Sequence, residues 1–455
     1  MLEDTIIAIS TPVGYGGIGI VRLSGDRSLP IAKKIFKPRK KNTEISALRS
    51  ILGNLYHFEQ KDFFEEAYLT YFPKPFTYTR EDMVEISCHG SPVTLEEVVR
   101  LGIKAGARMA NPGEFTLRAY FRGRIDILQA EAINDLIQAS SFKQAKISYN
   151  QIEGKLSQRT ASFRSQIIQL LSLIEASIEF PEENLHLSRK KMSKTIEKVI
   201  DSIKRLVESY SLGKTLAEGT TLAITGRANV GKSTLFNSLL ERERAIISHY
   251  PGTTRDYLKE SIRIKDSIFT LIDMAGIDKP VHPADKEAIK KGRELAAHSD
   301  GILLLFDSSR KESLEDLKLI NKFKDKKMLF LFNKIDLPQK INKSKLKREG
   351  KNHPFLEISA LKGTNLEKLK GILHQLFVPD QRQGEEVILH LRQKLLFEEV
   401  LESLLEGKRL LEEGYSEEVI AEEIRKALPL IGKLTGEIRA DEVIKEIFNR
   451  FCVGK

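Results

Sequence analysis

The chain has 455 residues, of which 41% are hydrophobic and 30% are charged, and its formal net charge is +10. This length allows roughly three domains with separate cores, and the composition excludes a disordered or membrane-spanning chain. The basic balance is compatible with RNA or another polyanion as a partner.

The N-terminus begins with Glu3 and Asp4 and lacks the basic and apolar regions of a signal peptide, so a cytoplasmic location and no membrane partner are expected. The two cysteines, Cys88 and Cys452, are too few for a disulfide scaffold and lack the spacing of metal ligands. A basic run at 340–351, where six of twelve residues are Lys or Arg, is most simply a solvated loop.

Residues 1–118 are predicted to form an α+β domain. Strand-like runs occur at 5–9, 19–23, 67–72 and 83–87, and a helix is expected to follow from Thr94. Thr94 and Glu97 have the spacing of a capping box, in which two side chains satisfy the first backbone N–H groups of a helix.

Residues 119–215 and 379–455 are predicted to be helical, because their apolar residues recur at steps of three and four. Two helical segments that flank an α/β segment most simply pack as one discontinuous all-α domain, from which the α/β domain projects. The apolar stripes run through Ile196, Val199, Ile200, Ile203, Val207 and Tyr210, and through Leu391, Leu395, Val400, Leu401, Leu404 and Leu405.

Residues 216–378 are predicted to form a Ras-like α/β domain, with strands at 221–225, 256–265, 267–273, 301–307, 328–333 and 355–359. The sequence Gly226-Arg227-Ala228-Asn229-Val230-Gly231-Lys232-Ser233 has the pattern of a phosphate-binding loop between a strand and a helix. In that context backbone N–H groups and the Lys232 ammonium face the phosphates, and Ser233 holds Mg²⁺.

The segment Asn333-Lys334-Ile335-Asp336 predicts that the base is guanine. A carboxylate such as Asp336 can accept hydrogen bonds from both the N1–H and the 2-amino group of guanine, which adenine does not offer together. Asp273-Met274-Ala275-Gly276 follows a predicted strand, and the ordered occurrence of the three motifs predicts a GTP site. The expected GTP contacts are Asn229, Val230, Gly231, Lys232, Ser233, Thr234, Ser248, His249, Tyr250, Pro251, Gly252, Thr253, Thr254, Asp273, Met274, Ala275, Gly276, Asn333, Lys334, Asp336, Ser359, Ala360 and Leu361.

Rapid GTP hydrolysis is expected to require catalytic groups that these motifs do not contain. Thr254 is the predicted second protein ligand of Mg²⁺, in a segment that hydrolysis would release. Where many small GTPases carry a water-orienting glutamine, this chain has Ile277, which cannot orient water. Either hydrolysis is slow, or another residue and another charge complete the site.

Three further segments resemble the MnmE (TrmE) family of bacterial tRNA modification GTPases: 11–22 (TPVGYGGIGIVR), 111–116 (NPGEFT) and the tail 451–455 (FCVGK). The resemblance covers essentially the whole chain. It implies an N-terminal domain that binds folate and dimerises, a helical domain and a G domain. It also implies a homodimer that joins the FAD-dependent protein MnmG in a heterotetramer.

In that family the two proteins install an aminomethyl or carboxymethylaminomethyl group on C5 of the wobble uridine, U34, of certain tRNAs. The resemblance implies that one carbon comes from a tetrahydrofolate derivative, such as the 5-formyl or 5,10-methylene form. It implies that Arg22, Glu85, Arg124 and Lys455 contact this folate. Considered singly and without the family, Arg22 and Arg124 would be surface cations.

The resemblance also implies activation by K⁺ when two G domains meet, with the ion in the place of an arginine finger. Asn229 would be its side-chain ligand, and Ser248, Tyr250 and Thr253 would enclose it. The family's water-positioning glutamate corresponds to Ile289 here, so Glu287 is the nearest candidate, with an exposed helix charge as the alternative.

Cys452 is separated by two residues from the terminal Lys455. It is a candidate for chemistry near the folate or the uridine, or else a small packing residue. A second hypothesis for the chain is a GTP-controlled RNA-binding switch in ribosome assembly. It predicts a KH-like module after the G domain, and residues 393–451 contain no Gly-x-x-Gly clamp of that kind. A folate enzyme with a vestigial G domain conflicts with the intact nucleotide motifs.

Overall fold

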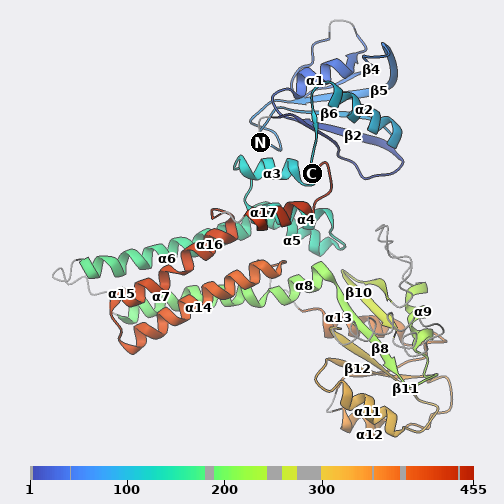
Figure 1. The fold of residues 1–455 in the computed structure, drawn as a ribbon. Helices are drawn as coiled ribbons and strands as arrows, with labels where there is room; N and C mark the ends of the chain where they lie inside the picture. Colours follow the sequence, from blue (N-terminus) through green and yellow to red (C-terminus); the bar gives the residue numbers. More distant parts are fainter. Residues whose placement is uncertain are drawn as a thin grey trace. The chain divides into compact units, whose positions relative to one another are not determined.

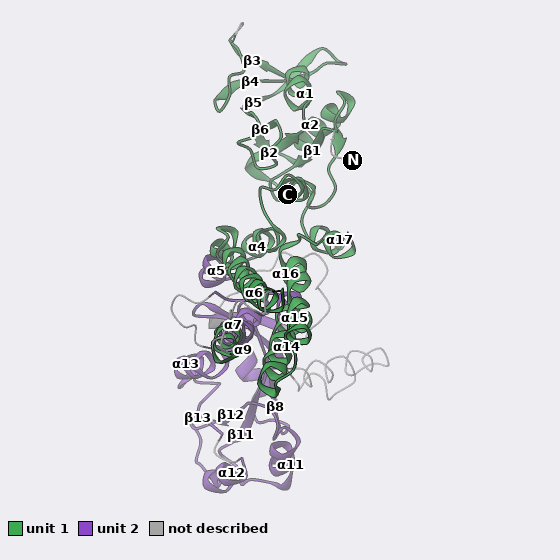
Figure 2. Ribbon diagram, turned by 90° about the vertical axis from the view of Figure 1, so that its left-hand side faces the viewer, with its two compact units in different colours: residues 1–138, 148–200, 396–455 green, residues 139–147, 201–395 purple. Residues whose placement is uncertain are grey.

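The computed structural model describes residues 4–40, 43–179, 189–242, 259–273, 299–350, 353–379, 386–438 and 441–455. They form two compact units, which Figure 2 colours separately: residues 1–138, 148–200 and 396–455, and residues 139–147 and 201–395. The four-segment division of the chain stays a prediction, because the first unit combines the N-terminal segment with parts of both helical segments.

The N-terminal part of the first unit is built on a seven-stranded sheet in the order β3-β4-β5-β6-β2-β1-β7. Helices α1 and α2 bury the apolar side chains of one sheet face, where Val21 and Ile86 belong to the same cluster as Val98 of α2. The predicted strands at 5–9, 19–23, 67–72 and 83–87 are confirmed, whereas α1, β3, β4 and β7 were not predicted. The elements are β1 (Ile6–Ile9), β2 (Gly16–Ser24), α1 (Ser28–Ile35), β3 (Phe36–Pro38), β4 (Ser50–His57), β5 (Asp62–Phe72), β6 (Met83–Gly90), α2 (Pro92–Lys104) and β7 (Arg108–Met109).

The predicted start of α2 at Thr94 is wrong. The helix begins at Pro92 after the N-cap residue Ser91, because proline at the first helical position lacks an N–H that would go unpaired and has a helical φ. Glu97 therefore lies within the helix, where it accepts hydrogen bonds from Arg100 at 2.7 and 2.5 Å.

Two blocks of helices that are far apart in the sequence pack together in the first unit. Helix α6 contacts both α15 and α16, and Phe163 of α6 packs edge to face on Phe397 with ring centroids 6.3 Å apart. The predicted discontinuous all-α domain is confirmed by this packing. Its helices are α3 (Glu114–Phe121), α4 (Ile127–Ile137), α5 (Phe142–Ile152), α6 (Lys155–Glu179), α7 (Arg189–Glu208), α14 (Leu391–Glu413), α15 (Glu417–Arg425), α16 (Ala427–Thr435) and α17 (Asp441–Asn449).

The second unit contains a six-stranded sheet in the order β13-β12-β11-β8-β10-β9, in which only β9 is antiparallel to its neighbour. Successive residues of β11 alternate between two buried faces, and the strand is accordingly apolar from Ile302 to Phe306. Its elements are α8 (Tyr210–Glu218), β8 (Thr220–Gly226), α9 (Lys232–Arg242), β9 (Lys259–Ile264), β10 (Ser267–Asp273), β11 (Gly301–Asp307), α11 (Leu314–Lys322), β12 (Met328–Asn333), α12 (Lys343–Glu349), β13 (Phe355–Glu357) and α13 (Leu366–Phe377).

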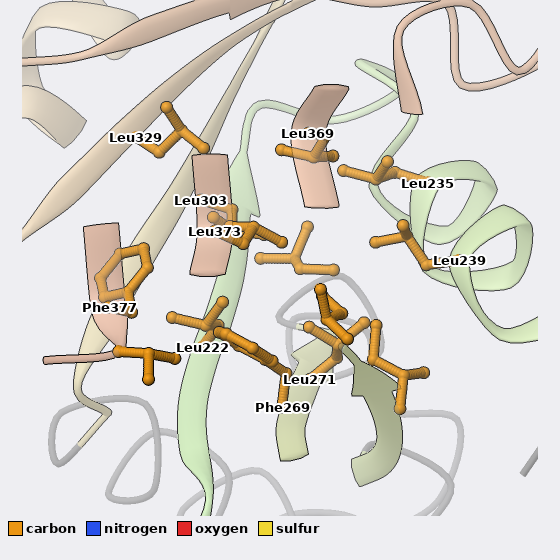
Figure 3. Packing of buried hydrophobic residues seen from close by; sticks show 14 of the residues in the cluster. Leu222, Leu235, Leu239, Phe269, Leu271, Leu303, Leu329, Leu369, Leu373 and Phe377 are labelled. Atoms are coloured by element: carbon orange, nitrogen blue, oxygen red, sulfur yellow. The ribbon is translucent and has the colours of Figure 1, made fainter. Parts of the chain in front are cut away.

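Helices cover both faces of this sheet. On one face Leu303 packs with Leu239 of α9 and Leu373 of α13, as Figure 3 shows. On the other face Leu304 belongs to a cluster that includes Leu346 of α12. A mostly parallel sheet with helices on both faces is the doubly wound arrangement of Ras-like domains, and the phosphate-binding loop follows its strand β8.

Candidate functional sites

The phosphate-binding loop connects β8 to α9, as its sequence pattern predicts. Two of its glycines are required by geometry: a Cβ on Gly226 would lie 2.5 Å from the Leu305 carbonyl oxygen, and one on Gly231 would lie 2.3 Å from Asn333 Nδ2. Both also have a positive φ, of 150° and 100°. Lys232 Nζ donates to the carbonyl oxygens of Gly226 and Arg227 at 2.8 and 2.9 Å.

Residues 333–336, predicted to read guanine and called the guanine-reading segment below, are joined to this loop by Asn333. Its Nδ2 donates to the Val230 carbonyl at 2.8 Å, and its Oδ1 accepts from the Ala360 N–H at 2.9 Å. Asp336 lies exposed nearby, and a hydrogen bond from Ser359 holds the pKa of its carboxyl below the usual value. The structure thus brings together three predicted nucleotide segments that are separated in sequence.

Two residues that were predicted to act on Mg²⁺ also lie side by side. Ser233 Oγ donates to Asp273 Oδ2 at 2.8 Å, so a hydroxyl from the start of α9 and a carboxylate from the end of β10 lie together. Oxygen atoms of this kind are the ligands that Mg²⁺ prefers.

A cavity of about 880 Å³ lies in the first unit, and all four predicted folate contacts line it. Arg22 and Glu85 are cross-strand neighbours on β2 and β6, and Arg22 donates to Glu85 Oε1 from Nε at 2.9 Å and from Nη2 at 2.7 Å. Arg124 stacks over Tyr78 with 4.8 Å between the guanidinium carbon and the ring centroid. The remaining wall is mostly apolar and includes Phe72, Phe76, Met83, Ile133, Leu136, Ile137 and Ile152.

The C-terminal tail brings Lys455 to this cavity. Residues Pro112 and Val453 form a β-bridge, and the Phe115 N–H donates to the Lys455 carbonyl at 3.1 Å. Gly454 has a φ of 97°, and a Cβ there would lie 2.1 Å from the Ile9 carbonyl oxygen, so only glycine fits. Burial and the nearby Arg22 lower the pKa of the Lys455 ammonium.

Two family models match the chain: "MnmE helical domain" over residues 127–452 and "GTP-binding protein TrmE N-terminus" over residues 5–124. The tRNA modification GTPase MnmE of Thermoanaerobacter sp. (strain X514) is 39% identical over 468 residues, covering 100% of both chains. This chain belongs to the MnmE family. The protein of the same name from Aquifex aeolicus (strain VF5) is 37% identical and also covers 100% of both chains.

As an MnmE family member, the chain is a GTP hydrolase of tRNA modification, and GTP is its substrate. Its architecture is the expected one, with an N-terminal α+β domain, a discontinuous helical domain and an inserted Ras-like domain. Among the helices of the described ranges, none combines the length and the apolar character that a membrane span requires.

Several predicted site residues of this MnmE family member lie outside the residues that the structure describes. They comprise the segment before β9, the segment after Asp273 and the candidate water-positioning residue. These positions are Ser248, His249, Tyr250, Pro251, Gly252, Thr253, Thr254, Met274, Ala275, Gly276, Ile277, Glu287 and Ile289.

The two cysteines differ in environment. Cys88 is buried in the core of the N-terminal sheet, and burial raises the pKa of its thiol to about 11, with a smaller contribution from Glu65. Cys452 is exposed and is not among the residues that line the cavity, although Lys455 in the same tail is. Its predicted chemical role stays a prediction.

The basic run at 340–351 is largely engaged in the fold of this family member. Lys343 pairs with Glu357 at 2.8 Å, Lys345 pairs with Glu312 at 3.4 Å, and Lys347 lies over the Phe355 ring. These contacts attach helix α12 to the neighbouring segments. The prediction that the run is a solvated loop is therefore wrong for residues 343–349, which form this helix.

The aromatic side of the cavity was not predicted from the sequence. Tyr78 donates to or accepts from Thr116 Oγ1 at 2.8 Å, and burial raises the pKa of its phenol. The run from Phe72 to Tyr78 holds three aromatic residues in seven positions, and this density was the available signal.

Proposed function

We propose that this chain is a K⁺-stimulated GTPase, activated when the nucleotide domains of a homodimer meet. Together with the FAD-dependent MnmG in a heterotetramer, it installs an aminomethyl or carboxymethylaminomethyl group on C5 of U34 in certain tRNAs. The family supports the tRNA reaction. The meeting of Arg22, Glu85, Arg124 and Lys455 at one cavity is the observation that supports a tetrahydrofolate derivative as the carbon source.

The residues of the cavity fit such a group. A reduced folate has a polar ring with N–H donors, an apolar middle and an anionic tail. Glu85, which pairs with Arg22, can accept from the ring, and the apolar wall from α4 suits the middle. Arg124 or Lys455 can meet an anion. The cavity volume lies within the usual range of small-molecule sites, about 300–1,000 Å³.

For the nucleotide, Lys232 and the loop N–H groups bind phosphates, and Ser233 with Thr254 would hold Mg²⁺ while Asp273 acts on it. When bound, Mg²⁺ and K⁺ would supply positive charge near the phosphates. Asn229 is exposed in the loop and would be the side-chain ligand of K⁺, completed by Ser248, Tyr250 and Thr253. Glu287 is proposed to position the attacking water.

The folate assignment is tested by calorimetric titration of the full chain with 5-formyltetrahydrofolate. Glu85→Gln and Lys455→Met are each expected to weaken binding by about tenfold or more, the usual effect of losing a charged hydrogen-bond partner. Glu59→Gln serves as a matched control. Like Glu85, Glu59 pairs with a basic side chain of the same domain, at 2.6 Å to Lys104, but it does not line the cavity. Unchanged affinity in both cavity variants contradicts the assignment.

The tRNA reaction is tested separately by nucleoside analysis of tRNA from cells that lack this protein. Loss of the modified wobble uridine is expected, and restoration by the wild-type chain is the control. Undiminished modification contradicts the proposed reaction and leaves the RNA-binding switch as the alternative.

A further inference from the structure

Asp307 ends strand β11 next to the nucleotide segments, but no motif of the sequence includes it. It is the register partner of Asn333 on the parallel strand β12, and its side chain is 6% exposed. Oδ2 accepts a hydrogen bond from Lys334 Nζ at 2.7 Å. Oδ1 accepts from the backbone N–H and the hydroxyl of Ser309 at 2.9 and 2.6 Å.

The Lys334 ammonium connects this carboxylate to the phosphate-binding loop. The same Nζ atom donates to the main-chain carbonyl of Asn229 at 2.7 Å, so the ammonium lies between Asp307 and the loop. Arg310 is a weaker partner of the carboxylate, at 3.7 Å and with 59% of its side chain exposed. Lys334 is therefore the main cation that Asp307 holds.

The two residues joined by the contact between the Lys334 ammonium and the Asn229 carbonyl both have an uncommon backbone conformation. Asn229 and Lys334 have φ values of 62° and 64°, in the left-handed region that non-glycine residues rarely adopt. Such conformations persist where surrounding contacts enforce them, and they concentrate at functional sites. The Asp307–Lys334–Asn229 bridge is a contact that acts on both residues.

The carboxylate is charged at neutral pH. Burial alone would raise the pKa of Asp307, but the hydrogen bonds from Lys334 and Ser309 outweigh burial and hold the pKa below its usual value. A charged acceptor fixes an ammonium more strongly than a neutral one does.

We propose that Asp307 is a positioning residue for the nucleotide: it holds the Lys334 ammonium on the Asn229 carbonyl and so couples the guanine-reading segment to the phosphate-binding loop. Loss of the charge leaves Lys334 with the carbonyl alone, and the loop relaxes from its left-handed geometry. The expected result is faster nucleotide release, because contacts inside a formed site act mainly on dissociation.

The experiment measures release of fluorescent N-methylanthraniloyl-GDP from the full chain by stopped flow, using Asp307→Asn, Lys334→Met and the double variant. Each single variant is expected to release the nucleotide about tenfold faster, as for loss of a charged hydrogen bond. The double variant is expected to be no faster than Lys334→Met, because Asp307 acts through the lysine. A purely structural role of Asp307 predicts additive effects instead, and additivity overturns the proposal.

Two further variants are controls that distinguish loss of the lysine contact from a folding defect. Ser309→Ala removes a hydroxyl donor from the same carboxylate but leaves the lysine pair, and it is expected to change release by less than about threefold. Asp266→Asn removes the acceptor of a 2.8 Å contact with His374 elsewhere in the unit and is expected to have no effect. The proposal is overturned if Asp307→Asn releases the nucleotide at the same rate as the wild type.

The inference rests on nucleotide binding at this loop, and the experiment separates a wrong nucleotide site from a wrong role for Asp307. If Lys334→Met leaves release unchanged, the assignment of the lysine to the nucleotide site is wrong, and the role of Asp307 falls with it. If Lys334→Met accelerates release while Asp307→Asn does not, the nucleotide site stands and only the positioning role is refuted.

Discussion

Replacing Arg118 should destabilise the N-terminal domain far more than replacing Arg108, although the two arginines share partners. Arg118 is 0% exposed and donates to Glu81 at 3.1 Å, to Glu114 at 3.0 Å and to Asp4 at 2.7 Å. Arg108 is 42% exposed and pairs with Glu114 and Asp4 at 2.6 Å each.

The magnitude follows from what each substitution leaves behind. Breaking a buried ion pair costs about 3–5 kcal/mol, because the remaining charge is uncompensated. After Arg118→Met, Glu81 keeps Arg122 at 2.7 Å, and Glu114 keeps Arg108, so the cost should lie near the lower end, at about 3 kcal/mol. Arg108→Met removes a largely exposed partner and should cost about 1 kcal/mol or less.

Hydrogen exchange followed by mass spectrometry measures this locally, which suits a chain with more than one unit. Amides of β6 and α3 should exchange roughly a hundredfold faster in Arg118→Met, since 1.36 kcal/mol is a factor of ten. They should exchange at most about fivefold faster in Arg108→Met. Amides of β11, in the other unit, should not change. Equal exchange in the two variants would refute the reasoning that burial sets the cost.

Four other predictions concern the nucleotide site and the two cysteines. GTP turnover should be roughly 10–100-fold faster in KCl than in NaCl at equal ionic strength, and Asn229→Ala should abolish the difference; equal rates in the two salts for the wild type would remove K⁺ from the mechanism. Glu287→Gln should lower K⁺-stimulated turnover while GTP affinity is retained, and unchanged turnover would exclude it as the water-positioning residue. One thiol per native chain should react with iodoacetamide at pH 7.5, and Cys452→Ser should abolish this reaction; labelling of native Cys88 would contradict its burial. Burial raises the folded-state pKa of Cys88 from 9.0 to about 11, so its neutral thiol contributes stability below pH 9. This contribution should be lost as the pH rises toward 11. Urea unfolding of Cys88→Ala and of the wild type across that pH range measures the loss.

Much of the nucleotide domain could be predicted from sequence because its signals are local. The glycines of the phosphate-binding loop are required by the conformation of a few consecutive residues. Residues 302–306 of β11 are an unbroken apolar run because both faces of the strand are buried. Helix periodicity similarly marked α7 through Ile196 and Ile203, both buried. Short elements such as β3 and β7 were missed, since pairing with neighbours rather than their own residues defines them.

The sequence by itself determined the type of nucleotide site, the kinds of domains and, through family motifs, the identities of the cavity residues. Only the tertiary structure decided that Arg22, Glu85, Arg124 and Lys455 meet at one cavity. Strand pairing joins Arg22 to Glu85, 63 residues away, and the docked tail brings Lys455 from the far end of the sequence. It also decided which charges are buried. Arg118 and Asp307 look like ordinary surface residues in the sequence, and burial beside specific partners is what gives them their roles.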